Sequence, residues 1–166
     1  MNLLLAAASL LAAVLVQDAT FAGEASAGDM HVVQVTVTDI GQFGDQYRAR
    51  RPAGFPDSAT RAALSDTILT TIFFDRCRAG GNGMCDLTGE MRLIDPRGEA
   101  GPPQNVIFWR FPPPQAGAPT MAQSMSAIRL AEGRPAGAYR VRLVVRDNVA
   151  GAEVTTERAL TIGEAP

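Results

Sequence analysis

The stretch Gly137-Ala-Tyr-Arg-Val-Arg-Leu-Val-Val-Arg-Asp147 decides the fold class of this chain. Every second position carries a large apolar side chain, namely Tyr139, Val141, Leu143 and Val145. Alternation with a period of two is typical of a strand that has one face in the core and one face in water. Glycine before the run and Asp-Asn after it are turn-forming residues. The stretch therefore predicts a long strand of an antiparallel β-sandwich.

The rest of the chain repeats this pattern with turn signals between the apolar runs. We expect an all-β, antiparallel two-sheet sandwich of about seven strands in a single domain. The expected strands are residues 30–40, 67–75, 85–95, 105–111, 122–130, 137–147 and 153–162. Arg158 falls on the inward face of the last strand, which predicts a bulge or an edge position there. No segment shows sustained helical periodicity.

The first residues resemble a secretory leader. Residues 3–16 form an apolar run that is shorter than the ~20 residues of a membrane span but suits a signal peptide. The motif Ala25-Ser26-Ala27 predicts cleavage before Gly28, with Thr20-Phe21-Ala22 as a second possible site. We therefore expect a signal peptide over residues 1–27 and one domain over residues 28–166. No basic residue precedes the apolar run, so the true start codon stays open.

The export prediction places the mature protein in the periplasm of a Gram-negative bacterium or outside the cell, without stable membrane insertion. All 15 basic residues are arginine, against 17 acidic residues in the whole chain. Cleavage of the leader would remove Asp18 and Glu24 and leave a nearly neutral protein. A balanced charge argues against nucleic acid as a partner.

The chain contains two cysteines, Cys77 and Cys85. A pair of cysteines in an exported protein predicts a disulfide bond. Because strand-like residues flank the glycine-rich segment between them, we expect the bond to staple the mouth of a hairpin and to contribute about 2–3 kcal/mol. The spacing is not that of a redox motif, and a closed zinc site needs four ligands.

The last two strands resemble bacterial exported immunoglobulin-like and fibronectin-III-like domains. The resemblance rests on the pattern Gly137-x-Tyr139-x-Val141-x-Leu143-x-Val145-x-Asp147, followed by a final alternating strand. It implies an immunoglobulin-like sandwich in which Tyr139 is a corner tyrosine that bonds back across the preceding turn. The antibody pattern of Cys-Trp-Cys is absent, because Trp109 follows both cysteines. Small periplasmic proteins of proteobacteria are similar in the same generic way.

Catalytic motifs are missing from the sequence. His31 is the only histidine, and we find no nucleophile elbow, zinc-protease motif or phosphate-binding glycine loop. We therefore predict a protein that is not an enzyme and has no cofactor. A hydrolase with a pair of carboxylates stays open as an alternative, because such a pair needs no sequence spacing.

A second alternative is a periplasmic copper carrier. Thioether and imidazole groups suit Cu(I), and the weak candidates for such ligands are Met30, His31, Met121 and Met125. For Met91, packing in the core is the better explanation.

The long segment over residues 41–64 is the best candidate for function. We expect it to be irregular, with one helical turn at residues 58–64, and long loops often carry function. Arginine with aromatic residues is enriched at binding surfaces, so we predict a loop that binds a protein partner through Phe43, Tyr47, Arg48, Arg50, Arg51 and Phe55. Aromatic plugging of the sandwich end is the alternative. A second row, Arg140, Arg142 and Arg146, is expected to face solvent.

Overall fold

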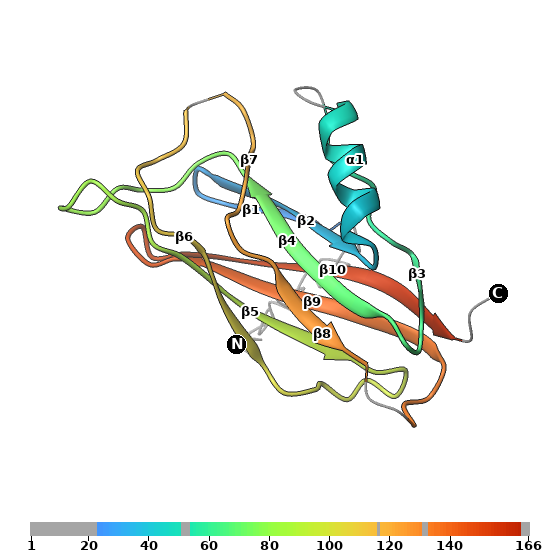
Figure 1. Ribbon diagram of the computed structural model, residues 1–166. Helices are drawn as coiled ribbons and strands as arrows, with labels where there is room; N and C mark the ends of the chain where they lie inside the picture. Colours follow the sequence, from blue (N-terminus) through green and yellow to red (C-terminus); the bar gives the residue numbers. More distant parts are fainter. Residues whose placement is uncertain (1–22, 51–53, 116, 131–132, 164–166) are drawn as a thin grey trace, which may run out of the picture.

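The computed structural model describes residues 23–50, 54–115, 117–130 and 133–163, which form two five-stranded sheets and one helix (Figure 1). Sheet A contains β1 (Glu24–Ala27), β2 (Met30–Val37), β4 (Thr67–Phe74), β7 (Thr120–Met121) and β8 (Ser126–Arg129). Sheet B contains β3 (Arg61–Ala63), β5 (Leu87–Ile94), β6 (Gln104–Trp109), β9 (Gly137–Asp147) and β10 (Ala152–Gly163). The helix is α1 (Ile40–Arg50).

The strand order places the longest pairings in the middle of each sheet. Sheet A runs β1-β2-β4, and β7 and β8 pair with successive halves of β4. Sheet B runs β3-β10-β9-β5-β6, and β3 is parallel to β10. The prediction of an all-β chain in two sheets is confirmed. The described residues contain ten strands rather than about seven, because β1, β3 and β7 are too short to show alternation.

The core between the sheets is built on the inward residues of β9. Tyr139, Val141, Leu143 and Val145 are all buried and pack in one cluster with the inward side chains of β4, among them Ile68 and Phe74. The hydroxyl of Tyr139 donates a hydrogen bond to the carbonyl oxygen of Pro135 at 2.7 Å. The resemblance to immunoglobulin-like domains implied a bond from Tyr139 back across the preceding turn, and the structure contains this bond.

A polar network also lies inside the sandwich, on the inward face of β2. The side-chain amide of Gln34 donates to the carbonyl of Val141 at 3.1 Å and accepts from the hydroxyl of Thr156 at 2.8 Å. Thr36 joins the network, with its hydroxyl 3.2 Å from that of Thr70. Burial of a polar group costs little when its hydrogen bonds are made. No buried side-chain nitrogen or oxygen among the described residues lacks a partner.

Residues 41–64 are not the irregular loop that the sequence predicted. Residues 40–50 form α1, and the helical turn expected at residues 58–64 is replaced by β3. The carboxylate of Asp39 accepts hydrogen bonds from the backbone N–H groups of Gly41 and Gln42 at 2.7 and 3.0 Å, which caps the helix. Two glycines, Gly41 and Gly44, lower the helix propensity of this segment. The beginning of α1 is therefore not evident from the sequence.

α1 covers the side of sheet A that faces away from sheet B (Figure 1). Phe43 of the helix is buried in a second apolar cluster with three valines of β2 and one residue of β4: Val33, Val35, Val37 and Phe73. Both faces of β2 are therefore buried. Of the helices in the described part of the chain, none has the length and hydropathy of a membrane span.

β1 overlaps the predicted cleavage motif. Residues 25–27 lie in β1 and pair with β2, with Ser26 opposite His31. The carbonyl of Gly23 accepts a hydrogen bond from the N–H of Gln34 at 2.6 Å. The apolar run over residues 3–16 and the second motif over residues 20–22 lie outside the described residues.

Arg158 of β10 completes the contact with the N-terminal segment. The pairing of β10 with β9 is continuous past Arg158, so the predicted bulge is absent. On its other side, β3 pairs only with residues 161–163 of β10, so Arg158 does lie at an edge of the described ladder. Its Nε donates to the carbonyl of Gln34 at 3.2 Å, and desolvation lowers its pKa.

Gly23 makes this contact possible. It has a φ of +63°, and a Cβ there would lie 1.7 Å from Nε of Arg158. The guanidinium group therefore occupies the space that only glycine leaves free.

Candidate functional site

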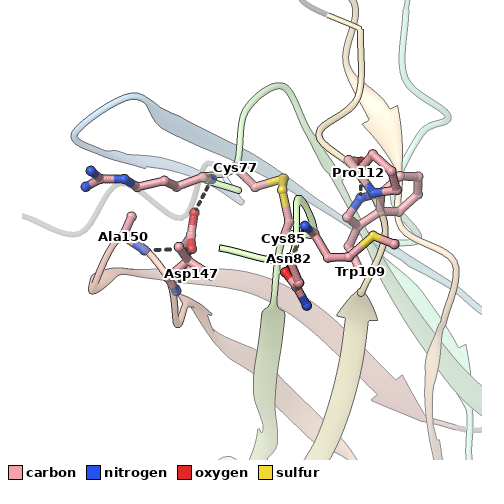
Figure 2. The surroundings of a disulfide bond; sticks show 10 residues. Cys77, Asn82, Cys85, Trp109, Pro112, Asp147 and Ala150 are labelled. Carbon is pink, nitrogen blue, oxygen red and sulfur yellow. Dashed lines mark hydrogen bonds between the residues drawn. A yellow bond between two sulfur atoms is a disulfide. The ribbon is translucent and has the colours of Figure 1, made fainter. Parts of the chain in front are cut away.

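The disulfide between Cys77 and Cys85 is present, with an S–S distance of 2.00 Å and Cα atoms 5.9 Å apart (Figure 2). It does not staple a hairpin. The segment that it closes connects β4 of sheet A to β5 of sheet B, and these two strands do not pair. The bond therefore fastens a crossover between the layers, and the sequence-based expectation is wrong because flanking alternation does not reveal which strands are partners.

Asp147, the last residue of β9, fixes the same end of the sandwich. Its carboxylate accepts hydrogen bonds from the N–H groups of Arg78 at 2.8 Å, Val149 at 3.0 Å and Ala150 at 2.9 Å. The residue is 2% exposed. Figure 2 shows this carboxylate between the disulfide segment and the turn. On the other side, the N–H of Cys85 donates to the carbonyl of Phe111 at 2.8 Å, which positions the segment that follows β6.

A cavity of about 550 Å³ lies beside the disulfide, and its lining includes Asp29, Asp75 and Asp147. Each of these carboxylates already has a partner. Asp75 accepts from the N–H of His31 at 3.2 Å, and Asp29 lies 3.8 Å from the guanidinium of Arg76. These interactions explain the carboxylates structurally, so the cavity gives the hydrolase alternative no specific support.

A second cavity, of about 700 Å³, lies between α1 and the segment after β6. We call it the aromatic groove. Its described lining is Tyr47, Gly54, Phe55, Phe73, Trp109, Gln115, Ala118, Pro119, Thr120 and Met121. Phe73 of β4 and Met121 of β7 form its floor, because both belong to the outer face of sheet A. The groove is therefore the part of that face which α1 leaves uncovered.

The aromatic rings of the groove hold one another in place. The ring of Phe73 lies 5.7 Å from that of Tyr47 and 5.1 Å from that of Phe55. Trp109 packs edge-on against Phe74 at 5.4 Å and against Phe111 at 5.5 Å. Such pairs add about 0.5–1.5 kcal/mol beyond their buried area. The groove is thus a preformed surface supported by the apolar core.

The structure divides the predicted partner-binding residues. Phe43 is 5% exposed and fastens α1 to sheet A, whereas Tyr47 and Phe55 line the groove. Arg48 is exposed and pairs with Asp45. Arg51 lies outside the described residues. Aromatic packing on the sandwich, the alternative explanation, accounts for Phe43, although it covers a sheet face and not an end.

Arg50 forms hydrogen bonds and an ion pair within the protein. Its guanidinium donates to the carboxylate of Asp57 at 2.9 and 2.5 Å and to the carbonyl of Phe55 at 2.9 Å. The hydrogen bond between Arg50 and Asp57 raises the pKa of Arg50 and lowers that of Asp57. This bidentate pair holds Phe55 near the end of α1 and so shapes one wall of the groove.

Sequence reasoning missed Phe73, Trp109 and Met121 as groove residues. Phe73 and Met121 belong to strands, where apolar side chains are expected in the core. Trp109 did carry a signal, since it is the single tryptophan of the chain and precedes three consecutive prolines. That signal marks an unusual segment but does not show that α1 lies opposite it.

The weak metal candidates do not share one surface. Met30 is buried in the cluster between the sheets, whereas Met121 and Met125 pack against the cluster under α1. His31 lies in β2 with Nε2 at 3.9 Å from a carboxylate oxygen of Glu24. Among the described residues, no three or more of His, Cys, Asp and Glu form a group that suits a metal ion. The four candidate ligands Met30, His31, Met121 and Met125 therefore do not lie in one cluster.

The arginine row of β9 lies on the outer face of sheet B. Arg142 Nε lies 2.5 Å and Arg140 3.2 Å from the carboxylate of Glu157 on β10. Arg146 lies 2.6 Å from Glu153. These cross-strand ion pairs explain the row as a solvent-facing surface.

Comparison with known proteins adds little to these observations. No family model matches the chain, and no curated protein matches it. A solved family 123 glycoside hydrolase from Clostridium perfringens is similar in structure over 81% of this chain, with a TM-score of 0.44 and 9% identity. The match spans 28% of that hydrolase.

Proposed function

We propose that this protein is an exported, non-enzymatic binding module with an immunoglobulin-like fold, which holds a protein partner in the aromatic groove. The observation that carries the proposal is the groove itself. Two segments far apart in the sequence, residues 47–55 and the end of β6, place Tyr47, Phe55 and Trp109 around one cavity of about 700 Å³. Aromatic side chains are enriched at the centres of protein interfaces.

The strand connections support the immunoglobulin-like part of the proposal. β2, β4 and β8 neighbour one another in one sheet, and β10, β9, β5 and β6 do so in the other. This is the order expected when strands A, B and E face strands G, F, C and C′. The bond from Tyr139 to Pro135 is that of a corner tyrosine at the start of strand F.

Export is supported by the disulfide, since such bonds persist in oxidising compartments. The position of β1 favours a different mature start from Gly28. Cleavage after Ala27 would remove all of β1, which pairs with β2 over residues 24–27. We therefore propose that a cleaved leader ends at Ala22, the second motif in the sequence, so that the mature protein begins at Gly23.

The groove differs from the predicted loop in how it would contact a partner. Arg50 is engaged with Asp57, so arginine contributes chiefly to the shape of the site. The binding energy would come from burial of exposed apolar surface, at about 25 cal/mol for each Å² removed from water. Arg48 lies on the solvent side of α1 and would contribute at the rim.

Site-specific photo-crosslinking in the producing cell tests the proposal. A crosslinking amino acid replaces Ala118, which is exposed on the groove, and a matched control replaces Ala159, which is exposed on β10 of sheet B. We expect one protein to be crosslinked from position 118 and not from position 159. Equal crosslinking from both positions, or none from position 118, would contradict the proposal.

A further inference from the structure

The side chains that line the aromatic groove limit the chemistry of the partner segment that it would bind. None of its described lining residues carries a charge. The polar groups among them are a phenol, an amide and a hydroxyl, from Tyr47, Gln115 and Thr120. A charged partner segment would lose its hydration in the groove, and none of the described lining residues would provide an opposite charge. The described lining therefore suits an uncharged, apolar partner segment better than a charged one.

The indole ring of Trp109 is held in place by a hydrogen bond within its own chain. The indole Nε1 of Trp109 donates a hydrogen bond to the carbonyl of Pro112 at 3.1 Å (Figure 2). This bond fixes the orientation of the indole ring. Trp109 is partly buried and lines the groove, so part of its surface faces a bound segment.

Addition of a partner strand to the sheet is disfavoured at this place. β7, the strand at the floor of the groove, contains two residues and pairs with β4 through Phe73 and Phe74. A strand added at β7 would gain a ladder of at most that length. A segment in the polyproline II conformation needs no ladder, because it has no internal hydrogen bonds and docks by its side chains in aromatic-lined grooves.

We propose that the aromatic groove binds an extended, uncharged, proline-rich segment of the partner in the polyproline II conformation. The inference rests on the proposed function, because it names the chemistry of the partner for the same site. Proline rings would lie between Tyr47 and Phe55 on one wall and Trp109 on the other. The preformed conformation of such a segment lowers the entropy that is lost on binding.

Intrinsic fluorescence provides a direct assay, because Trp109 is the single tryptophan and lines the groove. The purified protein with its disulfide intact is titrated with a neutral ten-residue oligoproline peptide. Two control peptides of the same length are a Gly/Ser peptide and an alternating Val/Thr peptide. We expect saturable spectral change with oligoproline alone. Equal change with Val/Thr, or no change with oligoproline, would overturn the inference.

A matched pair of variants links the signal to the groove. Ala118→Glu places a charge on the groove, and Ala159→Glu places the same charge on the outer face of sheet B. Both alanines are exposed, so neither substitution disturbs the core. We expect Ala118→Glu to weaken oligoproline binding about tenfold, equivalent to about 1.4 kcal/mol, and Ala159→Glu to leave it unchanged. Equal weakening by both variants would place the peptide elsewhere and refute the inference.

Failure of this inference is distinguishable from failure of the proposed function. If position 118 crosslinks one partner but oligoproline does not bind, the binding module stands and the partner segment has a different chemistry. If position 118 crosslinks nothing while oligoproline binds as a saturable ligand, the groove is specific for proline but the proposed partner interaction is wrong.

Discussion

The outer faces of the two sheets have opposite character. The outer face of sheet A carries valines and Phe73 and is covered by α1. The outer face of sheet B carries cross-strand pairs of arginine and glutamate, such as Arg142 with Glu157, and faces solvent. Both faces are built on alternating strands. The difference shows that the outer face of a sandwich strand can be apolar and buried when a helix from a connecting segment packs on that face.

The contrast also explains where the groove arises. Phe73 and Met121 belong to the apolar cluster under α1 and also line the groove, so α1 does not cover this face completely. The outer face of sheet B instead combines ion-paired arginine and glutamate side chains with an exposed apolar residue, Ile107. Apolar surface that is preformed and partly exposed typically marks an interaction site.

The largest expected effect is on the cover of sheet A. Phe43→Ala should destabilise the protein by about 3 kcal/mol, because it removes a buried ring and leaves a cavity. Ile107→Ala, on the outer face of sheet B, should cost less than about 1 kcal/mol, because Ile107 is 47% exposed and loses little buried surface. Urea unfolding followed by circular dichroism measures both. Similar losses in the two variants would remove the distinction between the faces.

The next largest expected effect is the loss of stability when β1, at the edge of sheet A, is removed. Two mature chains are compared, one beginning at Gly23 and one at Gly28, and the second lacks β1. The shorter chain should be less stable by about 2 kcal/mol, since it loses hydrogen bonds worth about 1 kcal/mol each, including the bond that the N–H of Gln34 donates to the carbonyl of Gly23. Thermal unfolding provides the measurement.

The mature start is read directly from the exported protein by N-terminal mass spectrometry. We expect Gly23 as the first residue. A start at Gly28 with undiminished stability would show that β1 does not belong to the mature fold.

The smallest effect concerns the ion pair that fastens the segment after α1. Because the hydrogen bond from Arg50 lowers the pKa of Asp57 in the folded protein, the pair stabilises the fold above the ordinary carboxyl pKa near 3.8. This contribution is lost as the pH falls through the lowered folded value. Asp57→Asn should abolish this part of the acid sensitivity. An unchanged dependence of the unfolding midpoint on pH in the variant would argue against a stabilising pair.

The sequence predicted the strands with clear alternation and the disulfide. β9 shows why, because its apolar side chains face the core and its arginines face water, so the pattern and the environment agree. β2 shows the limit of the same argument. Val33, Val35 and Val37 share one face, but that face lies under α1, while Gln34 and Thr36 face the interior. Alternation separates two faces and does not tell which one lies between the sheets.

The candidate site was predicted only in part for a similar reason. Tyr47 and Phe55 were identified from an aromatic segment with arginines, and both line the groove. Trp109 and Phe73 come from other segments, and nothing local to them indicates that α1 lies opposite. A groove between distant segments depends on packing, which single-sequence patterns do not encode.

The sequence by itself determined the all-β class, the inward set of β9 and the pairing of Cys77 with Cys85. The first two depend on a period of two, and the third depends on the chain having two cysteines. The tertiary structure alone decided that the disulfide joins two sheets, that α1 covers sheet A, and that an aromatic groove remains beside it. The physical reason is that these features depend on which faces meet, and contacts between faces are set by the packing of the whole chain.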